Sequence, residues 1–224
     1  MTAASPRAPE RPAQFRYAAV FLIVLALLVF EVLSPDASWS RAVGFAFAAL
    51  ALSVTVATSR QREEVRRART FAVAIAALFV IVGVATGVLS AAVTDVIGTV
   101  VLAVIPIALA GGVIRLIGQD GVTLQAVAGA LAIYLLIGLL FASAISFVAA
   151  VEHGSYFKQA SDVGNGVRVY YSFTVITTTG FGDYTAAHSV GHALAVLEEL
   201  TGQLYLVTVI GILVGNFVGR RLTK

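Results

Sequence analysis

The sequence contains no cysteine and few charged side chains. The absence of cysteine from its 224 residues excludes disulfides and thiolate metal sites. Asp, Glu, Lys and Arg together make up only 12% of the chain, whereas 59% of it is hydrophobic. This apolar content exceeds what a soluble domain needs for its core, so the composition favours a protein of the lipid bilayer.

Long apolar runs dominate the chain. A helix needs roughly 20 apolar residues to cross the hydrocarbon core of a bilayer. The sequence offers six runs of about this length, at 17–33, 42–59, 70–89, 96–117, 124–151 and 190–218. We therefore expect an all-α membrane protein with six transmembrane helices.

The basic residues set the expected orientation and organisation. Most of them fall before the first run, between the second and third, at the end of the fourth and after the sixth. Because cytoplasmic loops retain Lys and Arg, both termini are predicted to be cytoplasmic. The expected units are a tail at 1–16, a four-helix transmembrane bundle at 17–117, a linker at 118–123, a second membrane domain at 124–219 and a short C-terminus at 220–224.

A different pattern lies between the fifth and sixth runs. Residues 167–178 are too short to cross a bilayer and too apolar for an ordinary loop. We interpret them as a half-length, re-entrant helix that enters the membrane and stops. The stretch "TTTGFGDYT" at 177–185 ends and follows this helix, and non-helical backbone is tolerated at membrane depth only where it is buried or lines a watery path.

The glycines of this stretch predict an unusual backbone. Gly180 and Gly182 alternate with Thr179 and Phe181, so φ can alternate in sign at little cost. Such a chain points successive carbonyl groups to one side, and four copies around an axis would form rings of oxygen that replace the water around a monovalent cation. The preceding helix would direct its negative end towards the ions. Asp183 would concentrate cations at the outer mouth.

The segment "TTTGFGD" resembles the potassium-channel signature, whose common form is Thr-Val-Gly-Tyr/Phe-Gly-Asp. The resemblance covers residues 124–218, in the family's order of outer helix, pore helix, filter and inner helix. It implies a homotetramer that binds potassium in a selectivity filter, with an inner ion site at Thr178. The filter residues are Thr178, Thr179, Gly180, Phe181 and Gly182, with Asp183 at the mouth and Tyr170, Tyr171 and Thr177 as support.

Two departures from the family pattern leave alternatives open. Thr179 stands where valine is usual, and Phe181 lacks the hydroxyl that ties the filter to the surrounding aromatic residues. A less selective monovalent cation channel of the same architecture is therefore one alternative. The others are a secondary cation transporter, for which no convincing internal repeat is seen, and a non-conducting membrane assembly subunit.

The sixth run carries further candidate residues. Gly202 matches the family's hinge glycine, although a glycine that gives close helix packing is an equal alternative. If the register holds, Gln203, Leu206, Ile210 and Val214 share one face and line the cavity, the last two as a gate. Glu198 and Glu199 lie within this apolar run, where charge is expensive. At least one is expected to approach the half-length helix and support the filter, or else to make a structural contact without a role in permeation.

The remaining expectations concern function and location. The run 96–117 carries Arg115 at its end and lacks the repeated basic residues of a voltage sensor, so we expect weak or no voltage dependence. We expect no enzyme activity, no cofactor besides filter potassium, no nucleic-acid partner, and contact with membrane lipids. His153, His188 and His192 do not have metal-site spacing. With no glycosylation acceptor, the composition favours a bacterial inner (plasma) membrane.

Overall fold

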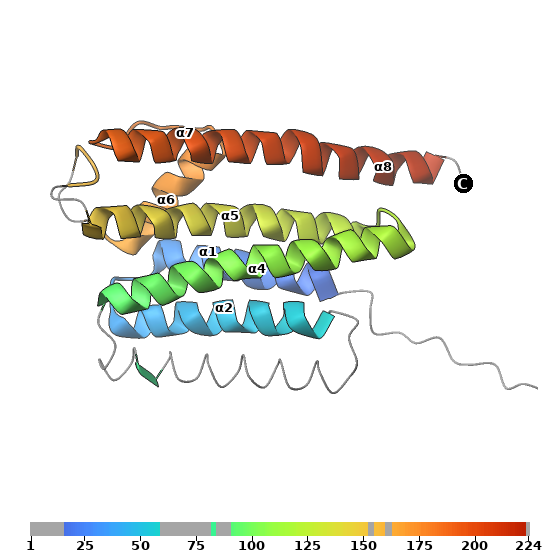
Figure 1. Ribbon diagram of the computed structural model, residues 1–224, viewed down its shortest axis with the longest axis horizontal. Coiled ribbons are helices and arrows are strands. Elements are labelled where there is room, and N and C mark those ends of the chain that lie inside the picture. The colour runs from blue at the N-terminus through green and yellow to red at the C-terminus, as the bar shows by residue number, and fades with distance from the viewer. Residues whose placement is uncertain (1–15, 59–81, 84–90, 152–154, 160–162, 223–224) are drawn as a thin grey trace, which may run out of the picture.

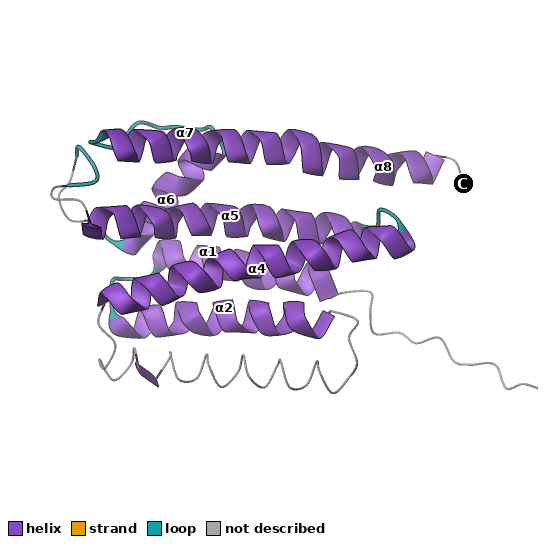
Figure 2. Cartoon of the chain, viewed as in Figure 1, coloured by secondary structure: helices purple, strands orange, loops and turns teal. Residues whose placement is uncertain are grey.

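The computed structural model describes residues 16–58, 82–83, 91–151, 155–159 and 163–222 (Figure 1). Its named elements are helices, and no named strand occurs in these ranges (Figure 2). They are α1 (Arg16–Leu33), α2 (Ser38–Thr58), α4 (Ala91–Asp120), α5 (Leu124–Val151), α6 (Asn165–Ile176), α7 (Ser189–Leu204), the π-helical segment η1 (Tyr205–Ile210) and α8 (Gly211–Leu222).

Three helices of the described chain are long and apolar enough to cross a membrane, at Val96–Asp120, Leu124–Val151 and Ser189–Gly219. Of two shorter apolar helices, Tyr17–Leu33 coincides with the first predicted span, and Trp39–Thr55 overlaps the second, predicted at 42–59. Most of the predicted third span, 70–89, and nearly all of the predicted tail, 1–16, lie outside the described residues. The helical, apolar character predicted from the sequence is confirmed for the ranges described.

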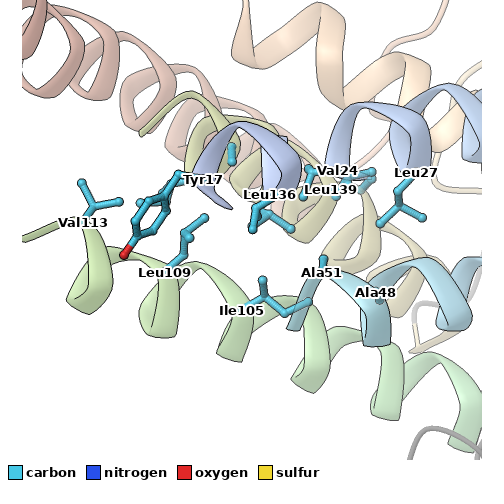
Figure 3. Close-up of a cluster of buried hydrophobic side chains, with 14 of the residues drawn as sticks. Tyr17, Val24, Leu27, Ala48, Ala51, Ile105, Leu109, Val113, Leu136 and Leu139 are labelled. Carbon is cyan, nitrogen blue, oxygen red and sulfur yellow. The ribbon is translucent and has the colours of Figure 1, made fainter. Parts of the chain in front are cut away.

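Helix α5 joins the two halves of the protein. It packs against α1 and α4 on one side and against α6 and α7 on the other (Figure 1). One cluster of buried side chains runs through α1, α2, α4, α5 and α6, and Figure 3 shows part of it. Its buried members include Val20, Val24, Leu27, Ala48, Ala51, Ile105, Leu109, Val113, Leu136, Leu139 and Val169.

The predicted linker at 118–123 is shorter in the structure. Helix α4 continues to Asp120, Gly121 adopts a φ of 71°, and α5 begins at Leu124. Gly118, the first residue of the predicted linker, lies inside α4 because a glycine within a helix is tolerated when its neighbours favour the helix. Because the core is continuous from α4 to α5, the two predicted halves share one packed interior.

The turn between α1 and α2 holds the beginning of α6. The backbone amide of Asn165 donates a hydrogen bond of 2.8 Å to Oδ1 of Asp36, and the Asn165 side-chain amide donates to Oε2 of Glu31. A β-carbon on Gly166 would lie 2.7 Å from the carbonyl oxygen of Val32. A carboxylate at a helix N-terminus interacts favourably with the helix dipole, so α6 starts at a fixed point of the bundle.

The middle of α6 lies close to α5. A β-carbon on Gly138 would lie 2.7 Å from Cζ of Phe173, and Ser172 Oγ donates a hydrogen bond of 2.7 Å to the carbonyl oxygen of Gly138. Small residues allow helices in membranes to approach closely enough for van der Waals contact. Gly138 is therefore the residue that sets the α5–α6 distance.

Replacing Gly138 with alanine is expected to destabilise the protein by about 1–3 kcal/mol, because the new methyl group overlaps the Phe173 ring. The matched control is Gly111→Ala in α4, where a β-carbon meets nothing within 4 Å. This control should leave stability unchanged or raise it by up to about 1 kcal/mol, since alanine favours the helix. Thermal unfolding of the detergent-solubilised variants measures both; equal midpoints would contradict the close contact.

Candidate functional site

The backbone after α6 alternates in the sign of φ. The angle is 57° at Thr178, 50° at Gly180 and 79° at Gly182, whereas Thr179 and Phe181 are not in the positive region. The predicted positive φ of the two glycines is confirmed. Sequence analysis missed Thr178, because it assigned this conformation to glycines alone. A non-glycine residue in this region costs ~1–3 kcal/mol and is typical of functional sites.

Four carbonyl groups in this segment have no hydrogen-bond donor. The amides of Thr179 and Gly180 donate hydrogen bonds of 2.9 and 3.0 Å to Thr174 O in the last turn of α6. In contrast, no described group donates a hydrogen bond to the carbonyl oxygens of residues 178–181. These four residues, all exposed in the single chain, are Thr178, Thr179, Gly180 and Phe181. Their oxygens are available to bind a cation.

The threonine hydroxyls are hydrogen-bonded within the segment. Thr177 Oγ1 donates to Phe173 O at 2.6 Å and lies 2.8 Å from Thr179 Oγ1. Thr178 Oγ1 donates to Thr177 O at 2.7 Å and accepts from Nε2 of Gln203 at 3.1 Å. Sequence analysis placed Gln203 on the cavity face; its contact with Thr178 connects that face to the base of the glycine segment.

Tyr170 connects α6 to the far end of the segment. Its hydroxyl donates a hydrogen bond of 2.8 Å to Oδ2 of Asp183, and its ring lies parallel to that of Phe181 with centroids 6.3 Å apart. This hydrogen bond raises the pKa of Tyr170 above its usual value, so the phenol remains a donor at neutral pH. The Phe181 ring contributes stacking but no hydroxyl.

An aromatic cluster supports the segment from behind. The Phe157 ring lies 4.9, 5.0 and 5.5 Å from the rings of Tyr156, Tyr171 and Tyr184, each in an edge-to-face arrangement. Phe157 also pairs with Ala186 in an isolated β-bridge. Sequence analysis named Tyr171 but missed Phe157 and its other neighbours, because they lie in polar, loop-like segments. The local density of aromatic residues was the available signal.

Glu198 is fully buried and contacts the helix before the segment. Its Oε1 accepts a short hydrogen bond from Ser172 Oγ. The same hydroxyl also bonds to Gly138 O. The other carboxyl oxygen, Oε2, is buried and has no hydrogen-bond partner. Glu199 is exposed in the single chain. The structure therefore brings Glu198, and not Glu199, against α6, and it adds Ser172 and Gly138, which sequence analysis did not single out.

Gly202 lies where α7 meets the end of α6. It is buried, and a β-carbon there would overlap the carbonyl oxygen and Cγ1 of Ile176. Of the two sequence-based interpretations, close helix packing thus has direct geometric support. The same carbonyl of Ile176 accepts a hydrogen bond of 3.2 Å from the hydroxyl of Tyr134 in α5. The Tyr134 ring in turn stacks on Tyr205, at 6.0 Å.

The inner half of the last span contains a π-helical segment. Leu206 and Ile210 both belong to η1 and are half-buried, whereas Val214 in α8 is exposed. Sequence analysis assumed a regular α-helix when it placed these residues on one face. π-Helical turns inside α-helices occur frequently at functional sites, and the assignment of these residues to a cavity and gate stays a prediction.

Neither His188 nor His192 belongs to a metal-binding group of described residues. Within the described ranges, no group of three or more His, Asp or Glu residues is placed to hold a metal ion. His188 precedes α7, His192 Nε2 lies 2.9 Å from Ala186 O, and His153 lies outside the described residues.

Comparison with known proteins gives one match. A family model described as an ion channel matches residues 130–218, which extend from α5 through α6 and the glycine segment into α8. No match was found among curated proteins or among solved structures. The family match supports an ion-channel domain over this part of the chain.

Removing the Ser172 hydroxyl is expected to lower stability by about 1–3 kcal/mol, because the buried Glu198 carboxyl loses its donor. Thr201→Ala is the matched control, since its hydroxyl is exposed and bonds only to Leu197 O in its own helix. We expect this control to change stability by less than about 0.5 kcal/mol.

Glu198→Leu completes a double-mutant cycle for this pair. The cost of Ser172→Ala should fall in the Glu198→Leu background, because no buried carboxyl then needs the hydroxyl. Detergent-denaturation midpoints of the four proteins measure the coupling. Additive effects would mean that the contact between Ser172 and Glu198 contributes nothing to stability.

Proposed function

We propose that the chain forms a homotetrameric, potassium-selective channel that conducts ions passively. The observation that carries this proposal is the run of four carbonyl oxygens without donors, at Thr178–Phe181, in a backbone of alternating φ. Fourfold rings of such oxygens can replace the hydration shell of a monovalent cation. The ion-channel match over residues 130–218 supports the same conclusion and argues for conduction instead of catalysis.

The electrostatics of α6 favour a cation at this place. The helix ends at Ile176, immediately before the segment, so the negative end of its dipole lies there. Asp36 occupies the opposite, positive end of the same helix. Asp183, exposed beyond Gly182, adds negative charge at the mouth of the path and attracts cations.

Assembly with further copies follows from the exposure of the segment. Its polar backbone cannot face hydrocarbon, so it must be enclosed by protein or line water. Of the three described helices long enough to cross a membrane, the last is the least covered: 11% of its most apolar stretch is buried, against 50% for α5. Identical subunits packed around the segment would cover both surfaces, and fourfold symmetry gives the rings that the proposal requires.

The support behind the filter is proposed to come from α5 and α7. Glu198 bonds to Ser172 in the middle of α6, and Gly202 allows α7 to lie against Ile176 at the end of α6. We assign Glu198 the role of holding α6 in the position that keeps the filter conducting. Glu199, exposed on the same helix, is then available for contacts between subunits.

The proposal includes little or no response to voltage. Helix α4 carries a single basic residue, Arg115, near its end. Moving one charge across the whole membrane field contributes only ~2.3 kcal/mol per 100 mV, and steep gating needs several charges per subunit. The proposed location is the inner (plasma) membrane with both termini cytoplasmic.

Thr179 supports a second candidate function, that of a non-selective monovalent cation channel. Its hydroxyl lies 2.8 Å from that of Thr177, so a polar group stands behind the filter where the family consensus has an apolar valine. A filter that adapts through this contact would admit sodium as well as potassium, as a non-selective monovalent cation channel does. The proposal of a secondary transporter has no comparable observation behind it.

Flux into liposomes that contain the purified protein tests the proposal. We expect potassium flux to exceed sodium flux by at least about tenfold. Gly180→Ala should abolish it, because a β-carbon at φ 50° strains the filter backbone. Gly111→Ala is the matched control, since Gly111 lies in α4, away from the last span, and its β-carbon meets nothing within 4 Å. Equal potassium and sodium fluxes would favour the non-selective channel, and flux that survives in Gly180→Ala would reject the filter assignment.

Tyr170→Phe should loosen the mouth of the filter without removing its stacking. The variant loses the hydrogen bond to Asp183 but keeps the ring that faces Phe181. We expect the sodium-to-potassium permeability ratio to rise by about two- to tenfold, as the loss of one hydrogen bond to a charged group corresponds to ~1 kcal/mol or more. Reversal potentials under bi-ionic conditions measure this ratio.

Tyr184→Phe is the control for this variant. The Tyr184 ring packs edge to face against Tyr170, with centroids 6.4 Å apart, and its hydroxyl makes no hydrogen bond to a described residue. Its permeability ratio should equal that of the wild type. Identical ratios for all three proteins would show that the contact between Tyr170 and Asp183 does not shape the filter.

A further inference from the structure

A cavity of about 410 Å³ lies between α1, α2, α4, α5 and α6. This volume falls within the range of small-molecule binding sites, about 300–1,000 Å³. None of the exposed residues from Thr177 to Asp183 lines it. The cavity is therefore separate from the proposed ion path, although it borders the first turn of α6 through Asn165 and Arg168.

The lining of the cavity is amphipathic. Its polar residues lie at the end of the bundle where α1 ends and α6 begins, and they include Glu31, Asp36, Arg41, Ser146, Asn165 and Arg168. Several apolar residues lie one helical turn further from that end: Leu27 precedes Glu31 by one turn, and Ala142 precedes Ser146 by one turn. Figure 3 shows that Leu27, Ala48 and Leu139, three of these apolar residues, come from three different helices.

Arg168 is half-buried, and no described group pairs with its charge; Arg41, the other cation of the lining, is exposed. Nη1 of Arg168 lies at a long 3.4 Å from Ser146 Oγ, and its Nε is buried without any hydrogen-bond partner. No carboxylate among the described residues forms an ion pair with it. The two carboxylates of the lining, Glu31 and Asp36, both accept hydrogen bonds from Asn165. Sequence analysis did not single out Glu31, although it lies within the first apolar run.

A half-buried guanidinium without a counter-charge is unfavourable, and the planar group is well suited to bind a carboxylate or a phosphate. The missing partner is thus an anion at the polar end of the cavity. The apolar lining beyond it favours a hydrocarbon group. Both parts together describe one amphipathic molecule, of a kind that a membrane supplies.

We propose that the cavity binds a single-chain amphiphile, whose carboxylate or phosphate head pairs with Arg168 and whose alkyl chain fills the apolar part. The volume, near the lower end of the range for ligand sites, limits the ligand to one chain. Bound there, the head contacts the first turn of the helix that ends at the filter. Regulation of conductance by this ligand rests on the proposed function, whereas binding itself does not.

Equilibrium binding of radiolabelled myristate to the full chain in nanodiscs of zwitterionic lipid tests the proposal. Unlabelled myristate and tetradecyl phosphate compete as the two sources of an anionic head, and tetradecanol carries the same chain without the charge. We expect saturable binding, with tetradecanol at least about tenfold weaker than the stronger anion. Which anion competes better identifies the head group. Equal competition by tetradecanol would overturn the assignment to Arg168.

Three variants locate the site. Arg168→Gln should weaken binding at least about tenfold, and Ala142→Leu should weaken it by filling the apolar part. Arg115→Gln is the matched control, because Arg115 is exposed and does not line the cavity. Wild-type affinity in both cavity variants would overturn the proposal. Each variant is first shown to elute from gel filtration as the wild type does.

Ion flux is measured separately, with and without myristate. Binding that depends on Arg168 but leaves potassium flux unchanged would support the site and reject its regulatory role. Binding in a protein without any flux would support the site and count against the channel. The failure of each proposal is thus distinguishable from the failure of the other.

Discussion

The exposed backbone from Thr177 to Gly182 is the constraint on which the rest of the structure depends. Its carbonyl groups are strong acceptors, and hydrocarbon supplies no donors, so leaving them in lipid would cost several kcal/mol each. They must therefore face water, ions or protein. The positive φ of Thr178 adds a local conformational cost. A segment of this kind persists only where its surroundings hold it in place.

Hydrogen bonds and aromatic packing hold the segment at its base, behind it and at its far end. At its base, Ile176 O accepts a hydrogen bond from Tyr134, and Gln203 donates to Thr178. Behind it, the rings around Phe157 pack edge to face. At its far end, Tyr170 binds Asp183. Each contact comes from a different part of the chain, and their geometry is therefore fixed by the tertiary fold.

The local features of the site were predictable from the sequence, but its long-range contacts were not. The glycine spacing predicted positive φ at Gly180 and Gly182, and the short apolar run predicted a helix close to the observed α6. The pairing of Glu198 with Ser172 joins residues 26 apart and depends on how α7 crosses α6. The positive φ of Thr178 was not predictable, because surrounding contacts impose it against the residue's own preference.

The front helices pack against the half of the chain that carries the glycine segment. Their side chains share one buried cluster with α5, and Asp36 and Glu31 bond to the first residue of α6. A sliding sensor would have to break this packing and these hydrogen bonds together. In the proposed channel, helix α4, with one basic residue near its end, would gain too little from the membrane field to do so. The same contacts connect the bundle to α6, so in the proposed channel a ligand in the cavity beside Asn165 would act on the glycine segment through one helix of 12 residues.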